Sequence, residues 1–224
     1  MMECAILIET STKVCSVGIY QQGHLTASKT LDTGKYVHAE TLLPILQEVI
    51  SSTKLELRNI SAIVVGEGPG SYTGLRIGAS MAKGICFGLG IPLYAIDSGT
   101  IYAYYARSIY PERKCYVSLI DAGRMEAYVS IYRSDMSRVS DYGAILLEEK
   151  YFSAPEFSDA IFVGDGIEKA KHLLTSGQKA LPKEPNVSLI ALALPEIHMQ
   201  AIDLHDFQPI YVKEYIPGKP KSML

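Results

Sequence analysis

The segment GEGPGSYTGLRIGASMAKG, from Gly66 to Gly84, constrains the fold of this chain more than any other part of the sequence. It continues the apolar run SAIVVGEG, which is typical of a buried parallel strand, and it leads into a helical pattern from about Gly74 to Leu89. A strand that passes through glycines onto a helix is a common way to bind phosphate. The segment therefore has to be compared first with the nucleotide-binding motifs.

It matches neither standard motif. A P-loop needs G-x-x-x-x-G-K-[ST], and neither Gly70 nor Gly74 begins such a run. A Rossmann turn needs G-x-G-x-x-G, but counting from Gly66 puts Ser71 at the last position, and counting from the next glycine puts Thr73 there. We expect a structural or protein-binding role for the segment.

Small residues recur at every fourth position of the predicted helix. Gly74, Gly78 and Ala82 form one row, and Gly84 and Gly88 form a second. Small side chains at this spacing allow another element to approach closely, although each internal glycine costs a helix roughly 1 kcal/mol relative to alanine. Two interpretations stay open: the first row packs on the chain's own sheet, or it faces a helix of another chain.

The first hundred residues predict the order β-β-β-α-β-α-β. The runs CAILIE, VCSVGIY and LTASKTL are expected to form an antiparallel meander with turns at TST and QQGH. Residues 39–52 carry apolar side chains at helical spacing, and IPLYAI supplies the last strand. This order predicts one lobe over residues 1–100.

The second half predicts another sheet, in a lobe over residues 101–213. Strand patterns occur at 115–120, at 126–133, in AILLEEK and in AIFVGDG. Helices are expected over 99–113, where one would join the two lobes, and over 166–174. The tail 214–224 contains two prolines and is expected to be extended or disordered.

Composition narrows the classes of function. Of the 224 residues, 48% are hydrophobic and 20% are charged, which suits a folded chain with a real core. The net charge of -3 provides no general attraction to nucleic acid. The four cysteines lack CxxC spacing, which favours reduced thiols over a zinc site. With no signal-peptide pattern and no sufficiently apolar span, a cytoplasmic protein without a membrane anchor is predicted.

Four segments, in this order, resemble the TsaB family, also called YeaZ. They are ILIETST, HAETLLPIL, VVGEGPGSYTGLRIGASMAKGICFGLGIPLYAI and IDAGRMEAY, within about the first 130 residues. The resemblance implies an α/β fold of the actin-like, Hsp70-like and sugar-kinase-like (ASKHA) type, with two lobes and a reduced C-terminal lobe. It also implies a non-catalytic scaffold that supports a TsaD-type enzyme, its catalytic paralogue, in forming threonylcarbamoyladenosine beside the tRNA anticodon.

The resemblance further implies partners. They are the TsaD-type paralogue, a TsaE-type ATPase and, when the chain is alone, a second copy, with tRNA contacted only indirectly. We expect the two helices of the first lobe to form the interface as half of a four-helix arrangement. The interface residues predicted are Leu42, Leu46, Val49, Gly74, Gly78 and Ala82. An isologous contact would make homodimer and heterodimer mutually exclusive.

In this fold superfamily the turn between the first two strands approaches the nucleotide phosphates. Here the turn is Thr10, Ser11 and Thr12, preceded by Glu9 where the family more often has aspartate. A vestigial phosphate turn and no bound cofactor are expected. The alternative is a local hairpin turn whose hydroxyls bond to nearby backbone groups.

No metal is predicted. TsaD-type enzymes hold their metal with H-x-x-x-H, whereas His38 is followed four residues later by Leu42, so His38 is expected to cap or pack at the helix start. A second group of possible ligands follows no known ligand spacing: His198, Asp203, His205 and Asp206.

The IDAGRMEAY segment departs slightly from the family pattern. Gly123 stands where the family often has arginine, and Arg124 follows it. We expect Asp121, Arg124 and Glu126 to pair with one another instead of catalysing a reaction.

Two other function classes remain as alternatives. A small actin-like ATPase or kinase would need a second phosphate loop, for which only VGDG, at 163–166, is a candidate. A glycoprotease-like metallopeptidase would need the missing second histidine.

Overall fold

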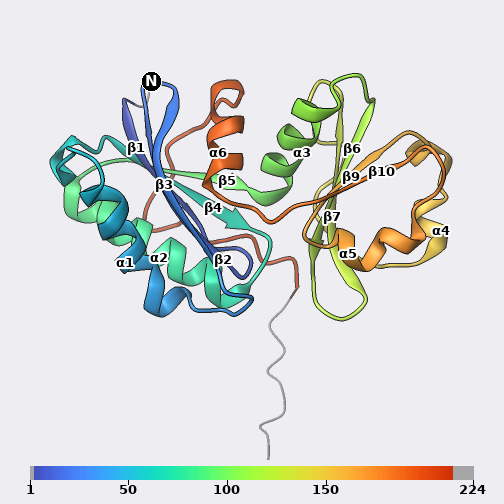
Figure 1. The fold of residues 1–224 in the computed structure, drawn as a ribbon, viewed down its shortest axis with the longest axis horizontal. Helices are drawn as coiled ribbons and strands as arrows, with labels where there is room; N and C mark the ends of the chain where they lie inside the picture. Colours follow the sequence, from blue (N-terminus) through green and yellow to red (C-terminus); the bar gives the residue numbers. More distant parts are fainter. Residues whose placement is uncertain (1–2, 214–224) are drawn as a thin grey trace, which may run out of the picture.

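The computed structural model describes residues 3–213, which form two lobes side by side (Figure 1). Each lobe is built on its own five-stranded sheet of mixed strand direction. The predicted tail at 214–224 lies outside the described residues.

The first sheet confirms the predicted order β-β-β-α-β-α-β. Its strands are β1 (Cys4–Glu9), β2 (Val14–Gln21), β3 (His24–Asp32), β4 (Ala62–Gly68) and β5 (Leu93–Asp97). They lie in the order β3-β2-β1-β4-β5, with an antiparallel meander on one side and parallel pairs of β1 with β4 and β4 with β5 on the other. The parallel strands end at the same edge of the sheet, where the glycine segment begins.

Helices cover both faces of this sheet. Helices α1 (His38–Ser51) and α2 (Tyr72–Leu89) pack on the face that carries Ile6 and Ile8 of β1. Helix α6 (Val187–Ala193) packs on the opposite face, which carries Leu7. The alternation along β1 follows from the two-residue repeat of a strand, and because both faces are covered every β1 residue is buried.

The second sheet has the order β10-β9-β6-β7-β8. Its elements are β6 (Cys115–Asp121), β7 (Glu126–Arg133), β8 (Gly143–Leu146), α4 (Glu149–Phe152), β9 (Ile161–Gly164), α5 (Ile167–Ala170) and β10 (Lys179–Pro182). AILLEEK is a strand only in its first part, and the helix expected over 166–174 is the short α5 followed by a 3-10 turn at Lys171–Leu173. Strand β10 and helix α6 were not predicted, because neither carries a clear periodic pattern.

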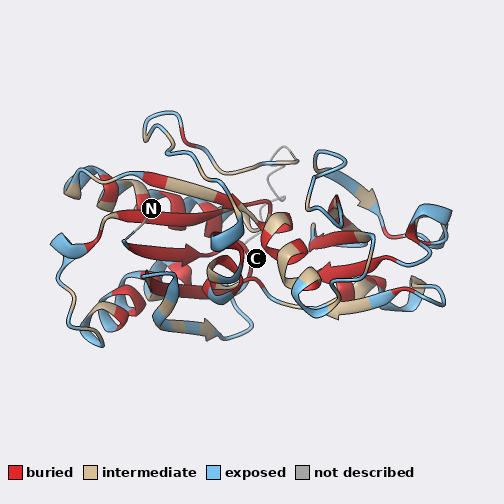
Figure 2. Ribbon diagram, turned by 90° about the horizontal axis from the view of Figure 1, so that it is seen from above, coloured by how far each residue is buried: buried red, intermediate tan, exposed pale blue. Residues whose placement is uncertain are grey.

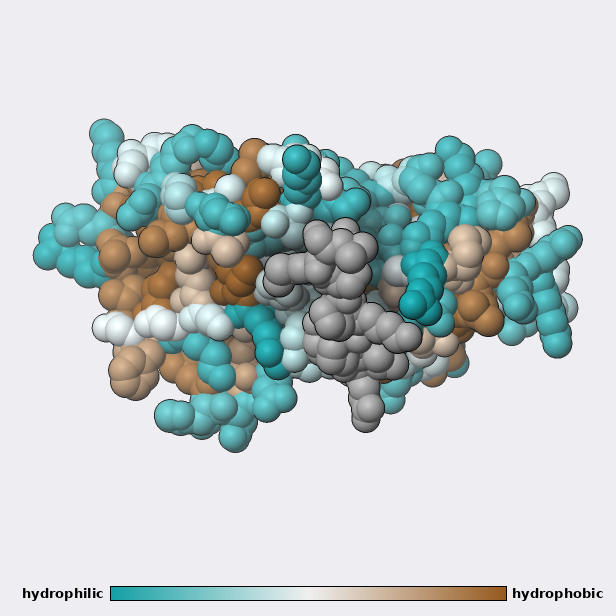
Figure 3. All heavy atoms as spheres, turned by 90° about the horizontal axis from the view of Figure 1, so that it is seen from below, coloured by the Kyte–Doolittle hydropathy of each residue, from teal (hydrophilic) through white to brown (hydrophobic). Residues whose placement is uncertain are grey.

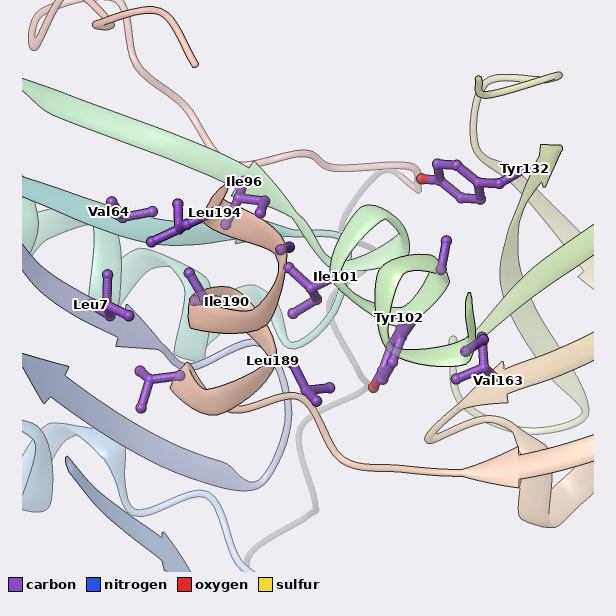
Figure 4. Packing of buried hydrophobic residues seen from close by; sticks show 14 of the residues in the cluster. Leu7, Val64, Ile96, Ile101, Tyr102, Tyr132, Val163, Leu189, Ile190 and Leu194 are labelled. Carbon is purple, nitrogen blue, oxygen red and sulfur yellow. The ribbon is translucent and has the colours of Figure 1, made fainter. Parts of the chain in front are cut away.

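Helix α3 (Ser98–Ile109) joins the lobes, as predicted, and its buried side chains belong to a core that both lobes share. In Figure 4, Ile101 and Tyr102 of α3 lie between Leu189 and Ile190 of α6 on one side and Val163 of β9 on the other. The two sheets are thus held together by a continuous apolar layer.

The chain returns to the first lobe after β10. Helix α6 packs there, and residues 200–213, here called the C-terminal strap, continue along it (Figure 1). Ile202 bridges to Leu93, and Phe207 is buried in the apolar cluster of the first lobe, beside α2. The lobe boundary expected at 101–213 therefore needs correction, since the chain leaves the second sheet at Pro182. Figure 2 shows the buried strands of both lobes between more exposed loops.

Candidate functional site

The turn between β1 and β2 is buried under the glycine segment. Thr10 and Ser11 are 0% and 1% exposed, and Thr12 is 6% exposed. The backbone N–H of Ser71, at the start of α2, donates to the carbonyl oxygen of Ser11 at 2.6 Å. The turn that would approach phosphates in a nucleotide-binding relative is thus covered by its own chain.

Four glycines allow this close cover. A Cβ atom on Gly66 would meet the Glu9 carboxylate, one on Gly70 would meet Ser11, and one on Gly74 or Gly78 would meet Thr10, each closer than 3.0 Å. Side-chain carbons do not approach other atoms so closely, so only glycine fits at these positions. The structure therefore decides for the first interpretation: the row Gly74, Gly78 and Ala82 packs inside the chain.

The polar groups of the turn mostly bond locally. Ser11 N–H donates to Glu9 Oε1 at 2.7 Å, and Val14 N–H donates to Thr12 Oγ1 at 3.2 Å. Glu9 Oε2 and Thr10 Oγ1 have no hydrogen-bond partner among residues 3–213. Burial raises the pKa of Glu9, which favours the neutral acid. A buried carboxyl group next to a covered turn offers no cationic or N–H surface for a phosphate.

The VGDG turn also bonds to its own lobe. The N–H of Gly166 donates to the Leu119 carbonyl at 2.9 Å, and Asp165 accepts hydrogen bonds from Asp121 N–H at 3.2 Å and from the Tyr102 hydroxyl at 3.4 Å. Burial, with the nearby charge of Glu184, raises the pKa of Asp165 to about 7. Through these contacts, the turn connects β6, β9 and α3.

Asp97 holds the lobes together at the end of β5. Its carboxylate accepts hydrogen bonds from the N–H of Thr100 at 3.0 Å and from the Thr100 hydroxyl at 2.6 Å, so it caps helix α3. It also accepts hydrogen bonds from Tyr132 of the second lobe at 3.1 Å and from Tyr142 at 2.5 Å. The Tyr142 hydroxyl in turn accepts from the N–H of Gly99 at 2.6 Å.

Glu67 lies beside this cluster, on the neighbouring strand β4. Burial raises its pKa to about 7, with the charge of Asp97 adding to the effect and that of Arg138 opposing it. Arg138 approaches Asp97 to 3.9 Å. The lobe interface therefore contains two carboxyl groups and one guanidinium, and Asp97 accepts hydrogen bonds from both lobes.

The possible metal ligands do not assemble. His38 is buried at the start of α1, where its Nε2 donates to the Val14 carbonyl at 3.2 Å, and burial lowers its pKa. In the other group, Asp203 accepts from the backbone N–H of His205 at 2.7 Å, which is a local turn. Within residues 3–213, no three His, Cys, Asp or Glu side chains lie together as a metal site would require.

The turn between β6 and β7 pairs differently from the prediction. Asp121 forms an ion pair with Lys169 of α5, and Glu126 forms one with Lys213 of the C-terminal strap. Arg124 joins neither pair and adopts a left-handed backbone with φ 47°. The expected mutual pairing of these three residues is wrong, because lysines that are distant in sequence pair with the two carboxylates instead.

The predicted partner-interface residues are buried. Leu42, Leu46 and Val49 of α1 are 1–4% exposed, and Ala82 of α2 is 0% exposed. They cannot contact a partner directly, because they face the sheet. The prediction of these side chains as a binding surface therefore requires correction, while the helix pair itself still presents another face.

That face is on the outer side of the two helices. Gly84 and Gly88, the second small row, have open space where a side chain would stand, and Ser80 is exposed one turn before Gly84. Phe87 is 78% exposed, and Leu43 of α1 is 51% exposed. Seen from below, hydrophobic residues gather on the surface of the first lobe (Figure 3).

Sequence reasoning missed the Asp97 cluster. Asp97 precedes SGT, which is an N-cap signal for α3, and this was the only local indication. Tyr132 and Tyr142 are far from it along the chain and gave no signal of their own.

No helix within residues 3–213 combines the length and apolar character needed to cross a lipid bilayer.

The known proteins that resemble this chain agree with one another in their descriptions. A family model described as TsaD, tRNA N6-adenosine threonylcarbamoyltransferase, matches residues 34–199. The tRNA threonylcarbamoyladenosine biosynthesis protein TsaB of Haemophilus influenzae is 28% identical, over 96% of this chain and 95% of that protein. The protein of the same name from Bacillus subtilis is 24% identical, with 93% of each chain covered.

A solved structure is similar in fold. YeaZ from Pseudomonas aeruginosa superimposes with a TM-score of 0.77 at 24% sequence identity, covering 94% of this chain and all of that chain. The match extends over both lobes and supports the two-lobed α/β architecture.

Proposed function

We infer the function of this protein from its family: the chain belongs to the family described as TsaD, tRNA N6-adenosine threonylcarbamoyltransferase, and within it to the TsaB (YeaZ) group. We propose that it takes part in tRNA threonylcarbamoyladenosine biosynthesis as a non-catalytic scaffold for the TsaD-type enzyme. The family match over residues 34–199 supports the pathway, and the covered β1–β2 turn supports the scaffold role.

The scaffold role is inferred from the covered β1–β2 turn, which does not present hydrogen-bond donors to a phosphate. In a nucleotide-dependent enzyme, donors have to face the developing phosphate charge. Here the Ser11 carbonyl and the Thr10 side chain face α2. The alternatives of an ATPase or a metallopeptidase receive no support from the geometry of Glu9 or His38.

The partner surface proposed is the outer face of α1 and α2. Ser80, Gly84 and Gly88 form a row that a partner helix could approach at about 8–10 Å between axes, and Leu43 and Phe87 supply exposed apolar area beside it. The buried residues of the same helices hold this face rigid. The apolar area and the small row together suit helix-to-helix packing.

The same face would serve a second copy when the enzyme is absent, so homodimer and heterodimer would compete. A TsaE-type ATPase would join the heterodimer, and tRNA would be bound through the enzyme. We place all of these steps in the cytoplasm.

Reconstitution with purified components tests this function. The measurement is threonylcarbamoyladenosine formed on tRNA by the TsaD-type enzyme and TsaE-type ATPase of the same source, with and without this chain. We expect strong stimulation by the chain and no ATP turnover by the chain alone. Product formation that does not depend on the chain would contradict the pathway role, and turnover by the isolated chain, lost in Thr10→Ala, would contradict the scaffold role.

A further inference from the structure

A small pocket lies between α2 and the C-terminal strap, beside the proposed partner surface. Its volume is about 300 Å³. Helix α2 and the strap both contribute to its wall, which consists of Arg76, Ala79, Ser80, Lys83, Phe207, Gln208, Pro209 and Tyr211. Among residues 3–213, no aspartate or glutamate lines the pocket, and α2 as a whole contains neither residue.

Aromatic rings of both elements hold the cations in place. The Arg76 guanidinium lies 4.1 Å from the centroid of the Tyr72 ring and 5.8 Å from that of Tyr211, and its Nε donates to the Tyr211 hydroxyl at 3.3 Å. Lys83 Nζ donates to the Phe207 carbonyl at 3.0 Å. Among the described residues, Arg76 donates only through Nε, to Tyr211, so its terminal nitrogens can serve an acceptor on a partner.

Within the part of the chain that the structure describes, no carboxylate pairs with either of these cations. Across residues 3–213, neither Arg76 nor Lys83 forms an ion pair with a carboxylate, whereas Lys29, Arg107, Lys169 and Lys213 each do. Oriented cations that lack counter-ions at the edge of an apolar docking face indicate electrostatic complementarity to a partner.

We propose that this pocket receives an acidic side chain, aspartate or glutamate, from a partner protein whose helix lies along the outer face of α2. Ser80 belongs both to the pocket wall and to the small row, so the pocket continues the docking surface. The Arg76 guanidinium can bind a carboxylate through two parallel hydrogen bonds. The inference rests on the proposed function, which supplies the TsaD-type enzyme as the partner.

The spacing of the cations favours a helix over a single phosphate. Arg76 and Lys83 are seven residues apart, which is about 10 Å along a helix. Acidic residues two turns apart on a partner helix would match this spacing. Arg76 is the principal anchor, because Lys83 already donates to Phe207.

The test compares Arg76→Gln with Arg58→Gln. Arg58 has a 78% exposed side chain, forms an exposed ion pair with Glu56 and lies in the 3-10 helix Leu57–Asn59 before β4, so it controls for loss of one surface charge. Affinity for the purified TsaD-type enzyme is measured by calorimetry at low and high salt. We expect Arg76→Gln to weaken binding about tenfold at low salt and to reduce the salt dependence. The Arg58→Gln variant should bind as the original chain does.

Different outcomes overturn different statements. If the unchanged chain does not bind the enzyme, the proposed function fails. If it binds and Arg76→Gln binds equally well, only the acid-binding pocket is wrong. If inorganic phosphate or tRNA binds the chain and Arg76→Gln removes that binding while the enzyme complex is unaffected, the pocket is a phosphate site. Circular dichroism checks folding, and Lys83→Gln, with a smaller expected loss, provides the second variant.

Discussion

Gly78 lies so close to the hydroxyl of Thr10 that no side chain fits between helix α2 and the β1–β2 turn. We predict that Gly78→Ala lowers the free energy of unfolding by about 1–2 kcal/mol, because overpacking at this contact exceeds the roughly 1 kcal/mol gain in helix propensity. Gly84 in the same helix has open space instead. Gly84→Ala should therefore raise the free energy of unfolding by up to about 1 kcal/mol.

Urea unfolding followed by circular dichroism measures both variants. Equal stability of the two would show that the Gly78 contact is not tight.

Gly84→Leu tests the outer face of α2 as the partner surface. A leucine there should leave the fold intact but hold a partner helix away, so we expect at least a tenfold loss of affinity for the TsaD-type enzyme. Gly143→Leu is a matched control, since Gly143 in β8 also has open space for a side chain. Calorimetry gives the affinities and thermal melting the stability. Undiminished binding by a folded Gly84→Leu variant would move the interface elsewhere.

Glu67 should make stability depend on pH. Its pKa is about 7 in the folded chain and 4.5 for the ordinary group, so the folded state binds the proton more tightly. The stabilisation is fully present below pH 4.5, and it is lost as pH rises from there through 7. In Glu67→Gln this loss should be absent, so the melting temperature should fall less between pH 5 and 8.

The exposed Glu168 provides a control, because Glu168→Gln should keep the original slope. A slope unchanged by Glu67→Gln would mean that the carboxyl of Glu67 is not protonated in the folded state.

Asp97 should contribute to stability through the tyrosines of the second lobe. Tyr142→Phe removes the hydrogen bond to the Asp97 carboxylate and also the one that Gly99 N–H donates to the Tyr142 hydroxyl, and it should cost at least about 1.5–3 kcal/mol of the free energy of unfolding. Asp97→Ala leaves both tyrosine hydroxyls without their acceptor and should cost more. The two losses should not add in the double variant, since they remove the same contact. Additive losses would show that Tyr142 and Asp97 act independently.

Local patterns determined the order of the elements in the first lobe and the helix that joins the lobes. The apolar runs CAILIE and VCSVGIY indicate buried strands, and helical spacing over 39–52 indicates one buried helix face, because burial is what organises these elements. The same reasoning excluded a P-loop and a Rossmann turn, because those motifs need particular residues at fixed positions. The resemblance to the TsaB family also depended only on residues and their order.

Only the tertiary structure decided which side of a helix meets which neighbour. The four-residue spacing occurs both in the row of Gly74 and Gly78 and in the row of Gly84 and Gly88, and only the position of Thr10 against α2 shows that the first row faces inward. Contacts such as Asp97 with Tyr142 join segments far apart in sequence, so no local pattern encodes them. The return of α6 and the C-terminal strap to the first lobe could not be predicted for the same reason. Their apolar runs are short, and the surface on which they pack exists only once the first sheet has formed.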